Sequence, residues 1–245
     1  MTIRVASYNV HKCIGSDGRH DPHRAIMVVN ALSADIVALQ EVDRRMGSRP
    51  AALPNRVIEE ETDFVVLDFD RTSPSSLGWH GQTVLARRGM HISAVTPLTL
   101  PGLEPRGAIS LEISEVGLPP FRLIAAHLGL RRTDRRAQLH RIGAEMAAAA
   151  PRPALAMGDF NEWSLRRGFE PLHGFTVHAP GRSFPARAPI GHLDRFVLGP
   201  GLRIVRAGVL DTPLSRRASD HLPVWADIGG LRDAPSGSGG IVRAQ

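Results

Sequence analysis

The 245-residue sequence is poor in several residue types, and each shortage excludes a class of protein. Cys13 is the only cysteine, so no internal disulfide can form, and a reducing compartment is consistent with this. No apolar run reaches the length needed to cross a bilayer, which excludes an integral membrane protein. The chain opens on an alternating strand pattern in place of an apolar signal segment, and we therefore expect a cytoplasmic protein.

Lysine and aromatic residues are also scarce. Lys12 is the only lysine, so arginine carries almost all of the positive charge behind a net charge of +6. The guanidinium group suits phosphate, but an arginine- and alanine-rich composition also follows from a GC-rich genome. The charge therefore permits nucleic acid or anionic lipid as substrate and selects neither. Aromatic residues make up 5% of the chain, and stacking platforms for single-stranded nucleic acid usually need more.

Short apolar runs bounded by glycine, proline or polar residues predict many strands. In the first run, Ile3 and Val5 lie on one face while Ala6 and Tyr8 lie on the other. Residues 82–127 hold several such runs separated by short turns, a spacing that predicts consecutive antiparallel strands. Strands are predicted at residues 3–10, 36–39, 64–69, 82–87, 91–95, 108–113, 121–127, 154–157, 195–198, 203–208 and 224–228.

Two helices are well marked in the sequence. Asp21 followed by Pro22 predicts the N-cap and first turn of one helix, and Thr133 is the predicted N-cap of the longest helix. Because strands outnumber helices and the helices separate groups of strands, we predict a single α/β sandwich domain over residues 1–228. Residues 229–245 contain the run Pro-Ser-Gly-Ser-Gly-Gly, and we expect them to form a disordered extension.

The segment Gly158-Asp159-Phe160-Asn161 follows the buried strand predicted at residues 154–157. In extended geometry Asp159 and Asn161 project to the same side and can converge on one ligand. The carboxylate can orient or deprotonate a water, while the amide donates to a phosphate oxygen without adding charge. Taken alone, the segment is more often an ordinary turn, since glycine, aspartate and asparagine are common turn residues.

Similar polar side chains stand at the ends of other predicted strands. Acidic groups, carboxamides and two histidines gathered at one rim have the chemistry of a hard-metal site with an acid and a base attached. The set comprises Asn9, Glu41, His127, Asp159, Asn161, Asp194, Asp220 and His221. Histidines without such a context are assigned to the surface or the core: His20, His23, His80, His91, His140, His173 and His178.

Seven short blocks that occur in a fixed order make the chain resemble the endonuclease/exonuclease/phosphatase superfamily. The blocks are Tyr8-Asn9-Val10-His11, Leu39-Gln40-Glu41-Val42-Asp43, Gly81-Gln82-Thr83-Val84-Leu85, Ala126-His127-Leu128, Gly158-Asp159-Phe160-Asn161, His192-Leu193-Asp194-Arg195-Phe196 and Ser219-Asp220-His221-Leu222-Pro223. The resemblance implies a four-layer α/β/β/α sandwich of two mainly antiparallel sheets flanked by helices. It also implies an active site at one rim of the sandwich.

The resemblance further implies a divalent cofactor, Mg²⁺ or Mn²⁺. Glu41 corresponds to the principal metal ligand of the family. Asn9 beside it would contact metal-bound water or phosphate, and Asp220 would lie near the metal. These three residues are therefore the predicted metal site.

Four residues correspond to the catalytic centre of the resembling proteins. Asp159 would orient or deprotonate the attacking water, and Asn161 would bind the phosphate. His221 would contact the scissile phosphate with Asp194 as its carboxylate partner. A carboxylate bound to imidazole fixes its tautomer and favours the imidazolium, which stabilises negative charge on phosphoryl oxygens.

His127 separates two branches of the superfamily. Apurinic endonuclease and exonuclease-type members carry tyrosine followed by Pro-Asn at this point, whereas deoxyribonuclease-I-like and sphingomyelinase-like phosphodiesterases carry histidine. The pair His127-Leu128 therefore disfavours repair of abasic DNA. His127 would act as general acid or bind phosphate, with Gln82 as its polar partner. Arg106 falls near a phosphate-contacting arginine of the deoxyribonuclease-I-like members, although a plain surface arginine is as good a reading.

The predicted function is that of a Mg²⁺- or Mn²⁺-dependent phosphodiester hydrolase in which water attacks in line. A small-molecule or phospholipid-headgroup substrate is favoured, and no protein partner is implied. A nucleic-acid endonuclease or exonuclease is the alternative that the basic charge supports. A catalytically silent binding module of the same fold is a third possibility, poorly supported because Glu41, Asp159, Asp220 and His221 are all present.

Overall fold

Strand β1 (Thr2–Asn9) lies in the middle of the fold because both of its faces are apolar. In the computed structural model, which describes residues 2–115 and 117–230, Ile3 and Val5 pack between two sheets. Ala6 and Tyr8 pack on the other side, against helices. The two faces predicted from the alternating sequence are therefore confirmed.

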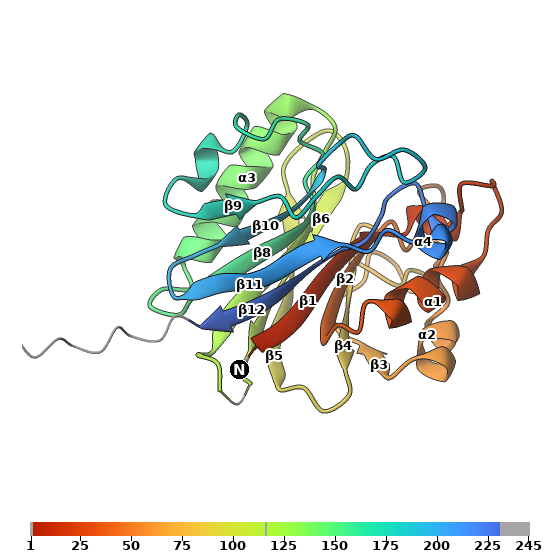
Figure 1. The fold of residues 1–245 in the computed structure, drawn as a ribbon, viewed down its shortest axis with the longest axis horizontal. Helices are drawn as coiled ribbons and strands as arrows, with labels where there is room; N and C mark the ends of the chain where they lie inside the picture. Colours follow the sequence, from red (N-terminus) through yellow and green to blue (C-terminus); the bar gives the residue numbers. More distant parts are fainter. Residues whose placement is uncertain (1, 116, 231–245) are drawn as a thin grey trace, which may run out of the picture.

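Two six-stranded sheets face each other across the central apolar layer (Figure 1). The first has the order β11 (Leu202–Val209), β12 (Val224–Gly230), β1, β2 (Ile36–Gln40), β4 (Thr83–Arg87) and β3 (Phe64–Val66). The second has the order β5 (Ile92–Leu100), β6 (Arg106–Ile113), β7 (Phe121–His127), β8 (Ala154–Asp159), β10 (Asp194–Leu198) and β9 (Thr176–His178). Each sheet contains one parallel pair, β1–β2 and β7–β8, and its other pairs are antiparallel.

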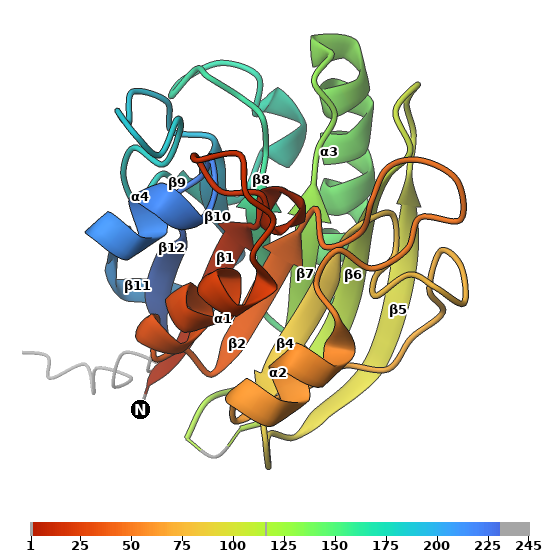
Figure 2. The ribbon, with the colours of Figure 1, turned by 90° about the vertical axis from the view of Figure 1, so that its right-hand side faces the viewer.

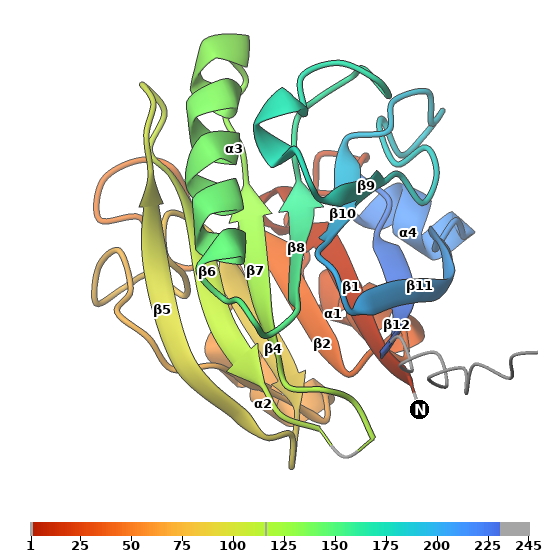
Figure 3. The same ribbon diagram turned by 90° about the vertical axis from the view of Figure 1, so that its left-hand side faces the viewer.

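Helices cover the outer face of both sheets and complete the four layers. Helices α1 (Pro22–Ala31), α2 (Asn55–Glu61) and α4 (Pro213–Ala218) supply buried residues to the apolar cluster outside the first sheet. Helix α3 (Arg132–Ala147) does the same outside the second sheet, together with the short 3-10 helix η2 (Glu170–Leu172). Figures 2 and 3 show the two helical layers on opposite sides of the sandwich. The predicted α/β/β/α sandwich is confirmed.

Some local predictions were wrong. Residues 82–127 are not one antiparallel run, because β4 belongs to the first sheet while β5, β6 and β7 are neighbours in the second. Thr133 is not an N-cap: α3 begins at Arg132, its N-cap is Arg131, and no side chain caps it. Within α3, Gln138 ties the helix to two loops, because it accepts from the Gly129 amide at 2.8 Å and donates to the Pro101 carbonyl at 2.9 Å. The predicted N-cap Asp21 is confirmed, since its side chain accepts from the Arg24 amide.

The C-terminal boundary also differs from the prediction. Gly229 pairs with Thr2 of β1, and Gly230 pairs with Leu202 of β11, so the sheet runs two residues past the predicted end of the domain at residue 228. Residues 231–245, the rest of the expected disordered extension, lie outside the described residues. Within the described part of the chain, no helix combines the length and apolarity required to cross a membrane.

Strand register brings the predicted site residues to one end of the sandwich. In the first sheet, Asn9 at the end of β1 is level with the end of β2, which leads into Glu41. In the second sheet, Asp159 at the end of β8 pairs with His127 at the end of β7 and with Asp194 at the start of β10. Figure 3 shows the arrowheads of β7 and β8 pointing to this end.

Candidate active site

Gly158 allows Asp159 to lie close to the neighbouring strand. Its φ of +151° is a conformation that other residues rarely adopt, and a Cβ atom there would lie 1.7 Å from the carbonyl oxygen of Ala126 in β7. Only glycine therefore fits between β7 and β8 at this level. The next residue, Asp159, leaves the sheet directly opposite His127.

The carboxylate of Asp159 is the meeting point of the site and is almost completely buried. Its Oδ2 atom accepts from the Asn9 amide at 3.0 Å and lies 3.5 Å from Nε2 of His127 and 3.6 Å from Nε2 of His221. Its Oδ1 atom accepts from the backbone N–H of Asn161 at 2.9 Å. The structure thus brings together both sheets and both predicted histidines at one oxygen.

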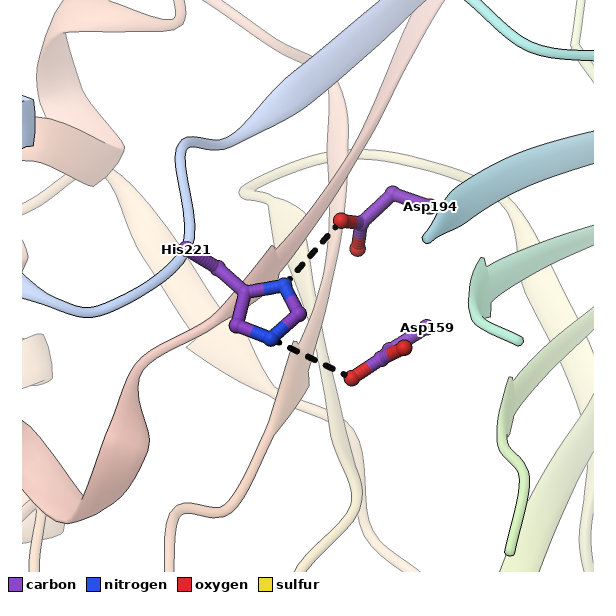
Figure 4. A group of neighbouring side chains, drawn as sticks. All are labelled: Asp159, Asp194 and His221. Carbon is purple, nitrogen blue, oxygen red and sulfur yellow. Dashed lines mark hydrogen bonds and ion pairs between the residues drawn. The ribbon is translucent and has the colours of Figure 1, made fainter. Parts of the chain in front are cut away.

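His221 lies between two carboxylates (Figure 4). Its Nδ1 atom is 3.2 Å from Oδ2 of Asp194, while its Nε2 atom faces Asp159. Burial opposes the imidazolium, but the charges of Asp159 and Asp194 outweigh it and raise the pKa of His221 to about 10. Ser183 donates to the same Asp194 oxygen at 2.5 Å. His221 is therefore a cation at neutral pH, held by the partner predicted for it.

His127 is in the opposite state. Burial and the adjacent Arg106 lower the pKa of His127 to about 3. Arg106 Nη1 lies 3.0 Å from Nδ1 and 2.9 Å from Nε2 of the ring. Because Nε2 also faces the Asp159 carboxylate, we assign the proton to Nε2 and the accepting lone pair to Nδ1. His127 is then a neutral imidazole that points an N–H toward the centre of the site.

Gln82 is not the hydrogen-bond partner of His127, so that prediction was wrong. Both polar atoms of its buried side chain lack a partner among the described residues. Its backbone is fixed by two hydrogen bonds to Trp79, and Arg106 contacts His127 instead. Gln82 keeps an unsatisfied amide beside the site, as a group that binds a polar ligand would.

Asn161 leaves the predicted extended path. Its φ of +51° turns the chain after β8, and its side-chain amide donates to the carbonyl of Leu128 at 2.9 Å. Asp159 and Asn161 are therefore joined by a backbone hydrogen bond rather than projecting in parallel. Phe160 between them is buried in the apolar layer under α3.

Glu41 forms the acidic arm on the first sheet. It accepts from Arg45 at 2.8 Å and from the ammonium group of Lys12. Burial opposes its ionisation, but the His127 ring, which is protonated at the acid pH where Glu41 titrates, together with Lys12 and Arg45 outweighs this effect and lowers the pKa of Glu41 to about 2. Glu41 is therefore an anion whose charge is balanced by cations of the chain.

The predicted metal ligands have suitable chemistry for Mg²⁺ or Mn²⁺. Among the residues that the structure describes, the half-exposed carboxylate of Asp220 has no ion-pair partner closer than the ring of His11, at 3.9 Å. Glu41 offers a second carboxylate, and Lys12 and Arg45 supply there the positive charge that a divalent cation would supply. Oxygen donors of this type fit a hard cation, with Asn9 alongside.

A second acidic group could also hold a metal ion. Among the described residues, ligand atoms of Asp159, Asp194 and His221 lie within 4.8 Å of one another. The raised pKa of His221 applies to the site without a metal, and a metal ion that bound the ring would displace its proton. The geometry therefore offers two places for a cation, one at Glu41 and Asp220 and the other at the Asp–His–Asp group.

Three features of the site were missed from the sequence. Ser183 stands in an ordinary loop and carries no signal in its neighbours. Lys12 could have been noticed, because the only lysine of the chain directly follows the Asn9 block. His80 was assigned to the surface or core, yet it lines a pocket next to Glu41 together with Arg49.

Comparisons with known proteins agree with this geometry. The sequence matches the model of the Endonuclease/Exonuclease/phosphatase family over residues 6–221. A functionally unknown conserved protein from Enterococcus faecalis V583 has a TM-score of 0.76 at 21% identity, over 94% of this chain and 100% of that one. The mannosyl-6-phosphatase Bt3783 of Bacteroides thetaiotaomicron VPI-5482 has a TM-score of 0.69 at 17% identity, over 92% and 99%. D. rerio TDP2 complexed with single strand DNA product has a TM-score of 0.70 at 15% identity, over 93% and 99%.

The solved structures support the fold alone at these identities, and a comparison with curated proteins gave no match. The family match carries more information than the structural likeness. It begins in β1 and ends at His221, so it spans every predicted site residue. Family members are usually hydrolases of phosphoester bonds and generally depend on a divalent metal. Asp159, the hydrogen-bond donors around it and Glu41 all lie within the matched residues. The chain belongs to the endonuclease/exonuclease/phosphatase family.

Proposed function

We propose that the protein is a Mg²⁺- or Mn²⁺-dependent phosphodiester hydrolase that directs water in line at phosphorus. The observation that carries the proposal is the single carboxylate oxygen of Asp159, which faces Asn9, His127 and His221. An acceptor surrounded by donors can take a proton from water while the donors hold the phosphoryl oxygens. This arrangement suits a phosphate centre better than a neutral substrate.

Each side chain has a distinct role in the proposal. Asp159 orients the attacking water and receives its proton. The His221 imidazolium, held by Asp194, stabilises negative charge on a phosphoryl oxygen. His127 donates its Nε2–H to another oxygen; its low pKa supports phosphate binding over the general-acid role. A divalent cation at Glu41 and Asp220 would supply further positive charge to the phosphate.

Hydrolysis of bis(p-nitrophenyl) phosphate with Mg²⁺ or Mn²⁺ tests the reaction class. We expect turnover that excess EDTA abolishes and that Glu41→Ala and His221→Ala each lower by about a hundredfold or more. Arg56→Ala, on the exposed face of α2, is the matched control and should retain full activity. Turnover that persists in EDTA, or in either site variant, would contradict the proposal and revive a silent binding module or another chemistry.

The rim of the site supports a phospholipid-type substrate. Of the eight large apolar side chains that are exposed in the described residues, six lie in loops at the site end: Met46, Leu103, Leu130, Trp163, Leu165 and Ile190. Exposed arginines occur in the same loops, among them Arg44, Arg45, Arg131, Arg166 and Arg167, and Arg132 follows at the start of α3. Figure 2 shows these loops rising at one end of the sandwich. Apolar and cationic groups at one end suit an anionic lipid surface.

Nucleic acid is the second candidate substrate, supported by the net charge of +6 and by the fold shared with D. rerio TDP2, solved with a single strand DNA product. Release of headgroup from anionic phospholipid vesicles is compared with nicking of plasmid at low salt. We expect vesicle hydrolysis that Trp163→Ala and Leu165→Ala together weaken. Plasmid nicking that falls steeply with salt, with no vesicle hydrolysis, would favour the nuclease.

Two further points belong to the proposal. Because a relative of the same fold is a mannosyl-6-phosphatase, a phosphomonoester such as mannose 6-phosphate is included in the assay, and we expect it to be a poorer substrate than the diester.

The cytoplasmic location stays a prediction, which fractionation of cells that express the protein would test.

A further inference from the structure

A pocket of about 150 Å³ opens beside the site, between Glu41 of the first sheet and His127 of the second. Its other walls come from residues 43–49, from His80 and Gly81, and from residues 104–106, with Leu130 at the rim. Glu41 and His127 therefore belong to both the site and the pocket. A phosphate held beside His127 would have one of its ester arms directed at the pocket.

Two of the four arginines that line the pocket are already paired. Arg45 is 2.8 Å from Glu41, and Arg106 is 2.8 Å from Glu104. The remaining carboxylate, that of Asp43, is buried and accepts from the backbone N–H groups of Leu77 and Gly78 at 2.7 and 3.1 Å. The acids of the pocket thus have partners of their own.

Arg44 and Arg49 line the same pocket without a carboxylate within 4.0 Å in the described part of the chain. Arg49 donates to Nδ1 of His80 at 3.0 Å, which fixes the guanidinium against the wall. Because Nδ1 accepts, the proton of a neutral His80 lies on Nε2, as a further donor. Neither guanidinium has an ion-pair partner in the described residues, although the buried Asp43 carboxylate is close enough to Arg49 for the two charges to interact. Two such guanidinium groups beside a histidine ring in a small cavity are suited to an anion.

We propose that this pocket binds a second anionic group of the substrate, most simply a second phosphate, so that the enzyme prefers phosphodiesters whose ester arm carries one. The inference rests on the proposed function for its place in catalysis, but binding of the second anion stands on the pocket alone. The shared chemistry is a phosphate a few bonds from the scissile one. A small bisphosphorylated headgroup and the adjacent phosphate of a nucleic-acid strand both provide it.

Competitive inhibition of bis(p-nitrophenyl) phosphate hydrolysis measures the second-anion site. The inhibitors are propanediol bisphosphate and propyl phosphate, compared at constant ionic strength. In the wild type we expect the bisphosphate to bind about tenfold more tightly, the factor expected for one charge-assisted hydrogen bond. In Arg49→Ala the ratio of the two inhibition constants should fall toward one, and Arg49→Lys should retain part of it.

Control variants distinguish anion binding in the pocket from the general effect of removing a positive charge. Arg44→Ala, in an exposed loop, gives a second reduction of the ratio if Arg49→Ala folds poorly. Arg56→Ala removes an arginine of α2 and should leave the ratio unchanged. A wild-type ratio near one, or a ratio that neither Arg44→Ala nor Arg49→Ala changes, overturns the proposal.

Two further measurements complete the test. One separates failure of the pocket proposal from failure of the proposed function, and the other identifies which kind of molecule carries the second phosphate. If the wild type does not hydrolyse the diester, the proposed function fails, and calorimetric titration with the same two inhibitors still tests the pocket. The dinucleotide thymidylyl-thymidine, with and without a 5′ phosphate, is the nucleic-acid probe. An Arg49-dependent preference seen only with the dinucleotide assigns the pocket to a strand phosphate, and one seen only with the propanediol compound assigns it to a small diester.

Discussion

His127 and His221 approach the same oxygen of Asp159 at 3.5 and 3.6 Å, and both are buried, yet their pKa values move in opposite directions. Burial lowers the pKa of both rings, so the difference comes from their charged neighbours. For His221 the charges of Asp159 and Asp194 outweigh burial, whereas for His127 the Arg106 guanidinium adds to the effect of burial. The shared carboxylate favours the charged form of both rings, and the second charged neighbour of each ring separates them. One site thus holds an imidazolium and a neutral imidazole side by side.

Gly158→Ala should have the largest effect, because it moves the oxygen that the two histidines share. A Cβ atom 1.7 Å from the Ala126 carbonyl oxygen forces β8 away from β7. We expect unfolding free energy to fall by about 3 kcal/mol or more, with loss of activity. Chemical denaturation measures the first and diester hydrolysis the second. Gly174→Ala, where the added Cβ atom would meet nothing within 4 Å although φ is +90°, is the control for backbone strain alone. Equal losses in the two variants would contradict the close approach of β7 and β8.

Asp194→Asn should make His221 resemble His127. The amide keeps the shape of the side chain but removes the charge that raises the pKa of His221. We expect kcat/KM to fall by about a hundredfold and the pKa of His221, followed by NMR titration, to fall. Ser183→Ala, which removes only a hydrogen bond to Asp194, should have a smaller effect on both. An unchanged pKa in Asp194→Asn would assign the cationic state of His221 to Asp159 alone.

Stability should depend on pH through His221 in a defined window. The folded pKa of about 10 is above the ordinary value of 6.5, so the ring binds more protons in the folded state between these values. Its contribution to stability is complete below pH 6.5 and is lost as pH rises toward 10, with a slope of at most about 1.4 kcal/mol per pH unit. Denaturation of the wild type and of His221→Gln between pH 7 and 9 measures the difference. Parallel curves for the two proteins would show that His221 is not a cation in the folded state.

Arg106→Gln should have the smallest effect and should make His127 resemble His221. Without the guanidinium, the pKa of His127 is expected to rise toward its ordinary value, since Arg106 is a cause of the shift second only to burial. The acid limb of the pH–rate profile should then move to higher pH, with a loss of about tenfold or less at neutral pH. Glu104→Gln keeps Arg106 while removing its carboxylate partner, and should leave the acid limb in place. A similar shift in both variants would assign the effect to the loop rather than to the guanidinium.

Much of the site could be predicted because its residues stand where strands end. His127, Asp159 and Asp194 follow from strand register, which the apolar runs of β7, β8 and β10 define in the sequence. What could not be predicted depends on contacts between distant segments. Arg106 contacts His127 from the neighbouring strand β6, whereas Gln82 leads into β4, which belongs to the other sheet, and local patterns do not specify that placement of β4.

Other misses have the same physical origin. The turn at Asn161 depends on the carbonyl of Leu128 in another loop, so an extended path was the natural expectation. The short strand β9 and helix α4 contain too few residues to show a period. Thr133 has the right chemistry for an N-cap, yet α3 begins one residue before it, at Arg132, and no side chain caps the helix. At these positions, tertiary contacts determine the local structure more strongly than residue propensity does.

The pairing of β1 with β12 has a consequence for how the protein acquires its activity during synthesis. Asn9 leaves the ribosome more than two hundred residues before Ser219, whose hydroxyl donates to the Asn9 carbonyl at 2.7 Å, and before His221 close by. Such distant contacts close slowly, since a long loop must be ordered first. The candidate active site therefore remains incomplete in the nascent chain until β12 adds to β1, and a chain arrested before residue 219 would lack both the Ser219 contact to Asn9 and the His221 ring that faces Asp159.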